Sequence, residues 1–165
     1  MMTVMKTGRA LWLAIAVCVI VLDALSKAWI VRHMALYQSI DLIPNLLSLT
    51  LLHNTGAAFS LLYSAGGWQR WLLAAIAVLV SAGLLTWIWR LRPGMEVLGW
   101  AISLVLGGAI GNLVDRLRLG YVVDFIHVHY GDWHFPAFNV ADSAITVGAV
   151  LMLIDMLVLE GRRHV

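Results

Sequence analysis

Four apolar segments, each about twenty residues long, constrain the fold of this chain more than any other feature of its sequence. A helix rises about 1.5 Å per residue, so a segment of this length crosses a hydrocarbon core of roughly 30 Å. Hydrophobic residues make up 62% of the 165 positions and charged residues only 12%, which is typical of a membrane protein. We therefore predict an all-α membrane protein whose residues 1–165 form a single four-span domain. The predicted spans cover about residues 10–31, 71–89, 97–114 and 141–159.

The number of spans decides which polar residues share a side of the membrane. With four spans, one face of the membrane collects the end of the first helix, the end of the third and the start of the fourth. The 32–70 and 116–140 connections lie on the same face. Ionisable groups beside a membrane span are costly unless they are paired, hydrated or used. The clustering holds whichever side is outside, and it predicts a functional site on that face. The residues collected there are Asp23, Lys27, Asn54, Asn112, Asp115, Arg116, Asp124, Asn139 and Asp142.

The basic residues indicate an orientation. Six Lys and Arg flank the spans on the side of the two termini, and four lie on the opposite side, with Lys27 inside the first span. Positive flanks favour the cytoplasm, so we expect both termini to be cytoplasmic and the polar face to point outward. The net charge of +2 suggests no nucleic-acid partner, and the single cysteine, Cys18, excludes a disulfide within the chain.

The outward connections have structure of their own. Residues 37–52 partly alternate between polar and apolar side chains around Pro44 and Asn45, which predicts a small β-hairpin, or cradle, lying on the bilayer. Residues 57–63 could form a short interfacial helix. Residues 122–128 are a candidate strand, and Gly131 and Asp132 a candidate turn.

Asp124 and Asp142 are the strongest catalytic candidates. Asp142 opens the fourth span, with Asn139 as a natural N-cap one turn earlier. Two carboxyl groups brought close together share a proton, so one can activate water while the other donates to a carbonyl oxygen. The alternative is that Asp142 only stabilises the helix N-terminus and that Asp124 is a solvated loop residue.

Asp23 and Lys27 have the i, i+4 spacing of an ion pair on one helix face, which favours a structural pair over a catalytic one. Asn112 and Arg116 have the same spacing. Arg116 could hold one aspartate ionised, or could simply extend to the membrane surface. Gly107, Gly108 and Gly111 favour close helix packing.

No metal signature accompanies the three histidines of the second outward connection, His127, His129 and His134. We expect no metal and no cofactor. Ser60 lacks the sequence context of a nucleophilic serine.

Five sequence blocks, in order, resemble the lipoprotein signal peptidase (signal peptidase II) family. They are DALSK at 23–27, NTGAAFS at 54–60, GGAIGNLVDR at 107–116, VVDF at 122–125 and FNVADS at 138–143. Each block alone is weak, but five in the expected order are specific, and together they span most of the chain.

The resemblance implies an aspartic endopeptidase of the bacterial inner membrane that cuts prolipoproteins just before their diacylglyceryl-modified cysteine. It assigns the catalytic pair to Asp124 and Asp142, and implies membrane lipid as surroundings, globomycin-type cyclic peptides as inhibitors and no nucleic acid. We also expect a monomer. The residues that the resemblance and the clustering place around the pair as substrate-binding or supporting groups are Asp23, Lys27, Asn54, Gly56, Gly108, Asn112, Asp115, Arg116 and Asn139.

Two other classes of function remain open from the residues alone. A small transporter could use Asp23, Lys27 and Asp142 as an ion relay, although the charges gather at one face and do not track across the membrane. A structural membrane partner would need no chemistry at all.

Overall fold

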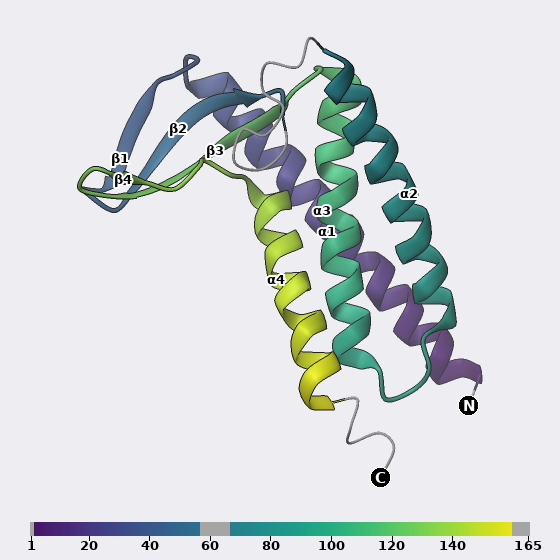
Figure 1. Cartoon of the computed structure of the whole chain (residues 1–165). Helices are drawn as coiled ribbons and strands as arrows, with labels where there is room; N and C mark the ends of the chain where they lie inside the picture. The colour runs from purple at the N-terminus through teal and green to yellow at the C-terminus, as the bar shows by residue number, and fades with distance from the viewer. Residues whose placement is uncertain (1, 57–66, 160–165) are drawn as a thin grey trace.

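The computed structural model describes residues 2–56 and 67–159, and these form a bundle of long helices with a small sheet at one end (Figure 1). The helices are α1 (Met2–His33), α2 (Trp68–Arg90), α3 (Glu96–Arg118) and α4 (Val140–Ile154), and α4 continues as a π-helical turn, η2 (Asp155–Leu159). The strands are β1 (Ser39–Ile43), β2 (Leu47–Asn54), β3 (Val122–Tyr130) and β4 (Trp133–His134).

Within the described residues, four helical segments are long and apolar enough to cross a membrane: Gly8–His33, Trp68–Arg90, Glu96–Arg118 and Val140–Val158. Many large apolar side chains point out of the bundle, including Leu25 (63% exposed) and Leu79 (72% exposed). A soluble protein rarely exposes so much contiguous apolar surface, whereas lipid covers it in a membrane. The predicted four-span architecture with a small β element is confirmed.

The sheet is antiparallel, with the strand order β1-β2-β3-β4. The predicted hairpin forms from β1 and β2, and Asn45 takes a left-handed conformation (φ 58°) that allows the tight reversal after Pro44. β2 then pairs with β3, which brings Leu52 opposite Asp124. The sheet projects from the end of the bundle where α1 ends and α4 begins (Figure 1).

α3 is the central helix of the bundle and packs against α1, α2 and α4 (Figure 1). Its Ile102 and Leu106 are fully buried with Trp12 of α1 and Ile88 of α2. A second apolar cluster joins the end of α1 to the sheet through Ile30, Leu51, Val123 and Phe125. The first cluster holds the helices together, and the second fixes the sheet relative to the bundle.

α3 runs to Arg118, one turn past the predicted third span, so that Asp115 and Arg116 lie on a helix. The short interfacial helix expected at 57–63, like Ser60, lies outside the described residues.

Glycines of α3 set its distance from α1. A Cβ at Gly107 would lie 2.7 Å from the backbone oxygen of Ala16 and 2.7 Å from Cβ of Val19. We expect Gly107→Ala to force the two helices apart and to lower stability by about 1–3 kcal/mol, the usual range for overpacking.

The matched control is Gly83→Ala in α2, because a Cβ at Gly83 meets no atom within 4 Å. This change should leave stability unaltered or raise it slightly, since alanine has the higher helix propensity. Melting temperatures of the two variants in the same detergent test the contrast. Equal melting temperatures would contradict close α1–α3 packing.

Candidate active site

Asp142 occupies the first turn of α4, where the chain forms a capping box. The side-chain oxygen of Asn139 accepts a hydrogen bond from the backbone N–H of Asp142 (2.9 Å), and Oδ2 of Asp142 accepts one from the backbone N–H of Asn139 (3.3 Å). The other carboxylate oxygen, Oδ1, accepts a bond from Nδ2 of Asn112 (2.7 Å). The N-cap predicted from the sequence is therefore confirmed, and it fixes the orientation of the carboxylate.

Asp124 lies on β3 and is 3% exposed. Its two carboxyl oxygens accept hydrogen bonds from two side-chain amides: Nδ2 of Asn139 at 2.7 Å and Nδ2 of Asn54 at 3.0 Å. The amide of Asn54 is itself oriented, because its oxygen accepts the backbone N–H of Gly56 (3.0 Å). Strand pairing between β2 and β3 brings Asn54 to this position.

Asn139 joins the two aspartates. It is fully buried, its oxygen holds the backbone of Asp142, and its Nδ2 donates to Asp124. The same Nδ2 lies within hydrogen-bond distance of the side-chain oxygen of Asn112 (3.3 Å) and of the carbonyl of Val123 (3.3 Å). A single neutral side chain thus links the carboxyl group of Asp124 to the backbone of Asp142.

A buried ionic cluster centred on Lys27 lies next to the pair Asp124 and Asp142. The ammonium group of Lys27 is 2.7 Å from Oδ2 of Asp23 and 2.9 Å from Oδ2 of Asp115, and it donates to the side-chain oxygen of Asn112 at 3.1 Å. The predicted pair with Asp23 is present, but Asp115, which has no spacing relationship to Lys27, is a second partner. Three donors of the ammonium group therefore meet three acceptors, which a buried charge requires.

Both carboxylates of this cluster also accept hydrogen bonds from backbone N–H groups next to the candidate pair. Oδ1 of Asp23 accepts the N–H of Ala141 (2.9 Å), the residue before Asp142. Oδ2 of Asp115 accepts the N–H of Val123 (3.2 Å), the residue before Asp124. Asp23 thereby satisfies a free N–H in the first turn of α4, and Asp115 anchors the start of β3. Sequence reasoning did not identify either contact.

Arg116 is the second cation of the site. It donates to the carbonyl oxygens of Asn112 (3.4 Å) and Gly56 (3.3 Å), and its charge interacts with those of Asp142, Asp124 and Asp115. The guanidinium therefore points into the site and does not extend to the membrane surface.

Two glycines of α3 let the other helices reach the site. A Cβ at Gly108 would collide with the carbonyl of Ala141, and a Cβ at Gly111 would lie 2.8 Å from Oδ2 of Asp23. Any larger residue there would displace α4 or the ionic cluster. Gly108 was among the predicted site residues, whereas Gly111 was interpreted only as a packing residue.

Burial raises the pKa of the Asp124 carboxyl to about 7, and the negative charge of Asp142 adds to the effect. The amides of Asn54 and Asn139 and the charge of Lys27 oppose this shift in part. Asp142 is less buried, and lies at a helix N-terminus that favours a negative charge. Burial therefore favours the protonated form of the Asp124 carboxyl near neutral pH.

This arrangement can perform general acid–base chemistry. When one of two neighbouring carboxyl groups is protonated and the other ionised, the pair can activate a water molecule and protonate a carbonyl oxygen. Apart from Gly108, which lets α4 approach α3, the residues that the sequence placed around the pair are joined to it, or to one another, by the contacts above. Their catalytic and binding roles remain predictions.

The sheet carries a second polar network that the sequence did not reveal. The hydroxyl of the buried Ser48 donates to Asp41 (2.7 Å) and lies 2.8 Å from Nε2 of His129. The rings of His127, His129 and His134 stand 5.1–5.5 Å apart. Among the residues that the structure describes, no three His, Cys, Asp or Glu side chains are arranged to hold a metal ion.

Comparison with known proteins gives a consistent result. A family model described as signal peptidase (SPase) II matches residues 15–158. A lipoprotein signal peptidase of Pseudomonas aeruginosa is 57% identical over 152 residues, covering 92% of this chain and 90% of the relative. One from Pseudomonas syringae is 54% identical over 150 residues, covering 90% and 87%. A bacterial membrane enzyme solved by the in meso method at 2.3 Å resolution superposes with a TM-score of 0.79 at 33% identity, covering 90% of this chain and 88% of the other.

The raised pKa of Asp124 predicts a pH-dependent effect of Asp124→Asn on stability. Below the ordinary pKa of 3.8 the carboxyl is neutral in both the folded and unfolded parent. Between there and about pH 7 only the folded parent keeps the proton, so the parent loses up to about 1.4 kcal/mol of stability per pH unit from this group. Asparagine does not titrate.

The melting temperature of Asp124→Asn relative to the parent should therefore rise from about pH 5 to pH 7 and level off above it. Taking the difference between the two proteins cancels the titration of the histidines. A difference that stays constant over this range, or that falls, would show that Asp124 is not held neutral by burial.

The ionic cluster predicts a strong effect of Lys27→Met. Removing the ammonium group leaves Asp23 and Asp115 as buried carboxylates without a counter-ion, which should cost about 3–5 kcal/mol. The triple variant Lys27→Met, Asp23→Asn, Asp115→Asn removes the charges together and should recover part of that loss in thermal unfolding. A single variant as stable as the parent would contradict the central role of Lys27.

Proposed function

The chain belongs to the signal peptidase II family, and we propose that it hydrolyses its substrates with the paired carboxyl groups of Asp124 and Asp142. As a member of this family it is a membrane peptidase that removes signal peptides from prolipoproteins. The observation that carries the proposed catalytic pair is the position of Asn139, which bonds to both aspartates where the sheet meets the start of α4.

In the proposed mechanism Asp142 is the base and Asp124 the acid. A water molecule attacks the scissile carbonyl carbon and gives a proton to the Asp142 carboxylate, while Asp124 protonates the carbonyl oxygen. The resulting gem-diol collapses as Asp124 takes back a proton from one hydroxyl group and Asp142 protonates the leaving nitrogen, so the C–N bond breaks. Both carboxyl groups return to their starting protonation states.

The assignment of the acid rests on the two environments. The raised pKa of Asp124 keeps its proton near neutral pH. Asp142 receives hydrogen bonds from Asn112 and from the backbone of Asn139, and both stabilise its ionised form. Arg116 adds a positive charge that stabilises negative charge on the pair as it moves during the reaction.

The depth of the pair fits a substrate anchored in the bilayer. Asp142 is in the first turn of the α4 span, and Asp124 is on the adjoining strand, so the pair lies where a span meets the membrane surface. A signal peptide that crosses the membrane as a helix ends at this depth. A diacylglyceryl group on the following cysteine would remain in the lipid, with the sheet beside it as a clamp for the modified segment.

We further propose the bacterial inner membrane as the location, with the termini in the cytoplasm and the pair facing the periplasm. The distribution of Lys and Arg supports this orientation, since Arg9, Arg90 and Arg92 lie at the end of the bundle away from the aspartates. We propose that the protein acts as a monomer, because Asp124, Asp142 and the amides that orient them belong to the same chain. Globomycin-type cyclic peptides would compete for the same site.

The test is cleavage of a diacylglyceryl-modified prolipoprotein by the purified protein in detergent. Asp124→Asn and Asp142→Asn should each lower kcat/KM by about a thousandfold or more, because each removes a proton-transfer group. Asp132→Asn is the matched control, since Asp132 lies exposed in the turn between β3 and β4 and should leave cleavage unchanged.

Two outcomes would overturn the proposal. Activity within tenfold of the parent in either folded variant would remove that aspartate from the catalytic pair. Failure of the folded parent to cleave the lipid-modified substrate, or equal cleavage of its unmodified form, would remove the proposed substrate class.

A further inference from the structure

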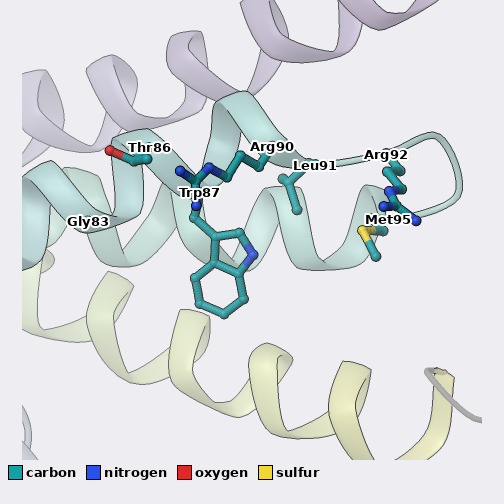
Figure 2. A pocket seen from close by; sticks show the side chains of 7 residues that line it. All are labelled: Gly83, Thr86, Trp87, Arg90, Leu91, Arg92 and Met95. Carbon is teal, nitrogen blue, oxygen red and sulfur yellow. The ribbon is translucent and has the colours of Figure 1, made fainter.

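A second feature of the molecule lies at the end of the bundle opposite the aspartates. A cavity of about 430 Å³ opens where α2 ends and α3 begins (Figure 2). Its lining comes from the last two turns of α2, the connection and the residue before α3. None of the residues discussed for peptide hydrolysis contributes to it.

The lining divides into an apolar part and a basic part. Gly83, Trp87, Leu91 and Met95 give a mainly apolar wall, and nothing lies within 4 Å of the position that a Cβ of Gly83 would occupy. The basic part consists of Arg90 and Arg92, both exposed. In Figure 2 the side chain of Arg90 runs back along α2 toward Trp87, and Arg92 stands at the connection near Met95.

The guanidinium groups of these two arginines have no partner of opposite charge among the described side chains. No hydrogen bond or ion pair to either guanidinium forms among the residues whose side chains the structure describes, 8–56 and 67–158. The nearby acid Glu96 accepts the backbone N–H of Gly94 (3.0 Å). By contrast, Arg9 at the same end of the bundle donates to the carbonyl of Trp89 (2.9 Å) and lies over its ring.

The depth of the two parts matches a lipid molecule. The α2 span ends at Arg90, so both arginines lie at the level of lipid headgroups, and Trp87 and Trp89 mark the interface. Gly83 is seven residues before Arg90 and therefore about 10 Å deeper in the hydrocarbon region. The cavity thus runs from a doubly positive rim at the surface to an apolar recess within the bilayer.

We propose that this cavity binds an anionic glycerophospholipid. Its phosphate lies between Arg90 and Arg92, and one acyl chain follows Trp87 toward Gly83. The net positive rim favours a lipid with net negative charge over a zwitterionic one, whose own ammonium group the arginines repel. The bound lipid supplies the counter-charge that the described protein does not.

The first measurement is native mass spectrometry of the purified full chain, released from detergent in the presence of phosphatidylglycerol or of phosphatidylcholine with the same acyl chains. The parent should bind phosphatidylglycerol more tightly. Arg90→Gln with Arg92→Gln should weaken that binding by about 25-fold, taking about fivefold for each arginine, and abolish the preference.

The matched control is Arg32→Gln with Arg118→Gln, which removes the same charge from the two exposed arginines at the opposite end of the bundle. It should leave the preference intact. Equal affinity of the parent for both lipids, a preference that survives in Arg90→Gln with Arg92→Gln, or the same loss in both double variants would overturn the proposal.

A second measurement places the acyl chain. Phosphatidylglycerol brominated on its acyl chains should quench the fluorescence of the parent more strongly than that of Trp87→Phe, with the difference lost when Arg90→Gln and Arg92→Gln are added. Brominated phosphatidylcholine should show no such difference. Equal quenching of the parent and Trp87→Phe by the anionic lipid would show that the lipid does not occupy the cavity.

Discussion

The buried ammonium group of Lys27 is the interaction on which the rest of this site depends. Two carboxylates within membrane spans would each be costly, and their contact with one cation makes both tolerable. Asp23 and Asp115 then use their remaining capacity to hold the backbone N–H groups of Ala141 and Val123. Ala141 and Val123 directly precede Asp142 and Asp124. The ammonium group of Lys27 therefore positions both aspartates indirectly, through Asp23 and Asp115.

Neutral side-chain amides orient the carboxyl groups of Asp124 and Asp142. Asn54, Asn112 and Asn139 donate to carboxyl oxygens without adding charge, so they orient the pair and still permit a raised pKa at Asp124. A lysine at the position of Asn139 would hold both carboxylates ionised and remove the acid. The asparagines therefore separate orientation from protonation, which the proposed chemistry requires.

Much of this arrangement could be predicted from the sequence. The apolar runs gave the four helices, the parity of the spans collected the polar residues at one end, and Asn139 was recognisable as the N-cap of α4. The bonds that complete the site join residues far apart in sequence, such as Asp23 and Ala141, 118 positions apart. Helical spacing identifies partners on one helix, so it found Asp23 for Lys27 and missed Asp115 on α3. The Ser48 network depends on the register of β2 and β3, which a bulge between Leu49 and Leu52 shifts.

The spacing of Asp23 and Lys27 also has a consequence for biosynthesis. The chain is made from its amino end, and Asn112 follows Lys27 by 85 residues, so α1 must enter the membrane long before the rest of its polar partners exist. Because Asp23 and Lys27 are one turn apart, they can neutralise each other in the newly inserted helix. Asn139 and Asp142 emerge last, and only then can the two aspartates come together. In a nascent chain, therefore, the proposed catalytic pair cannot form until the fourth helix is in place.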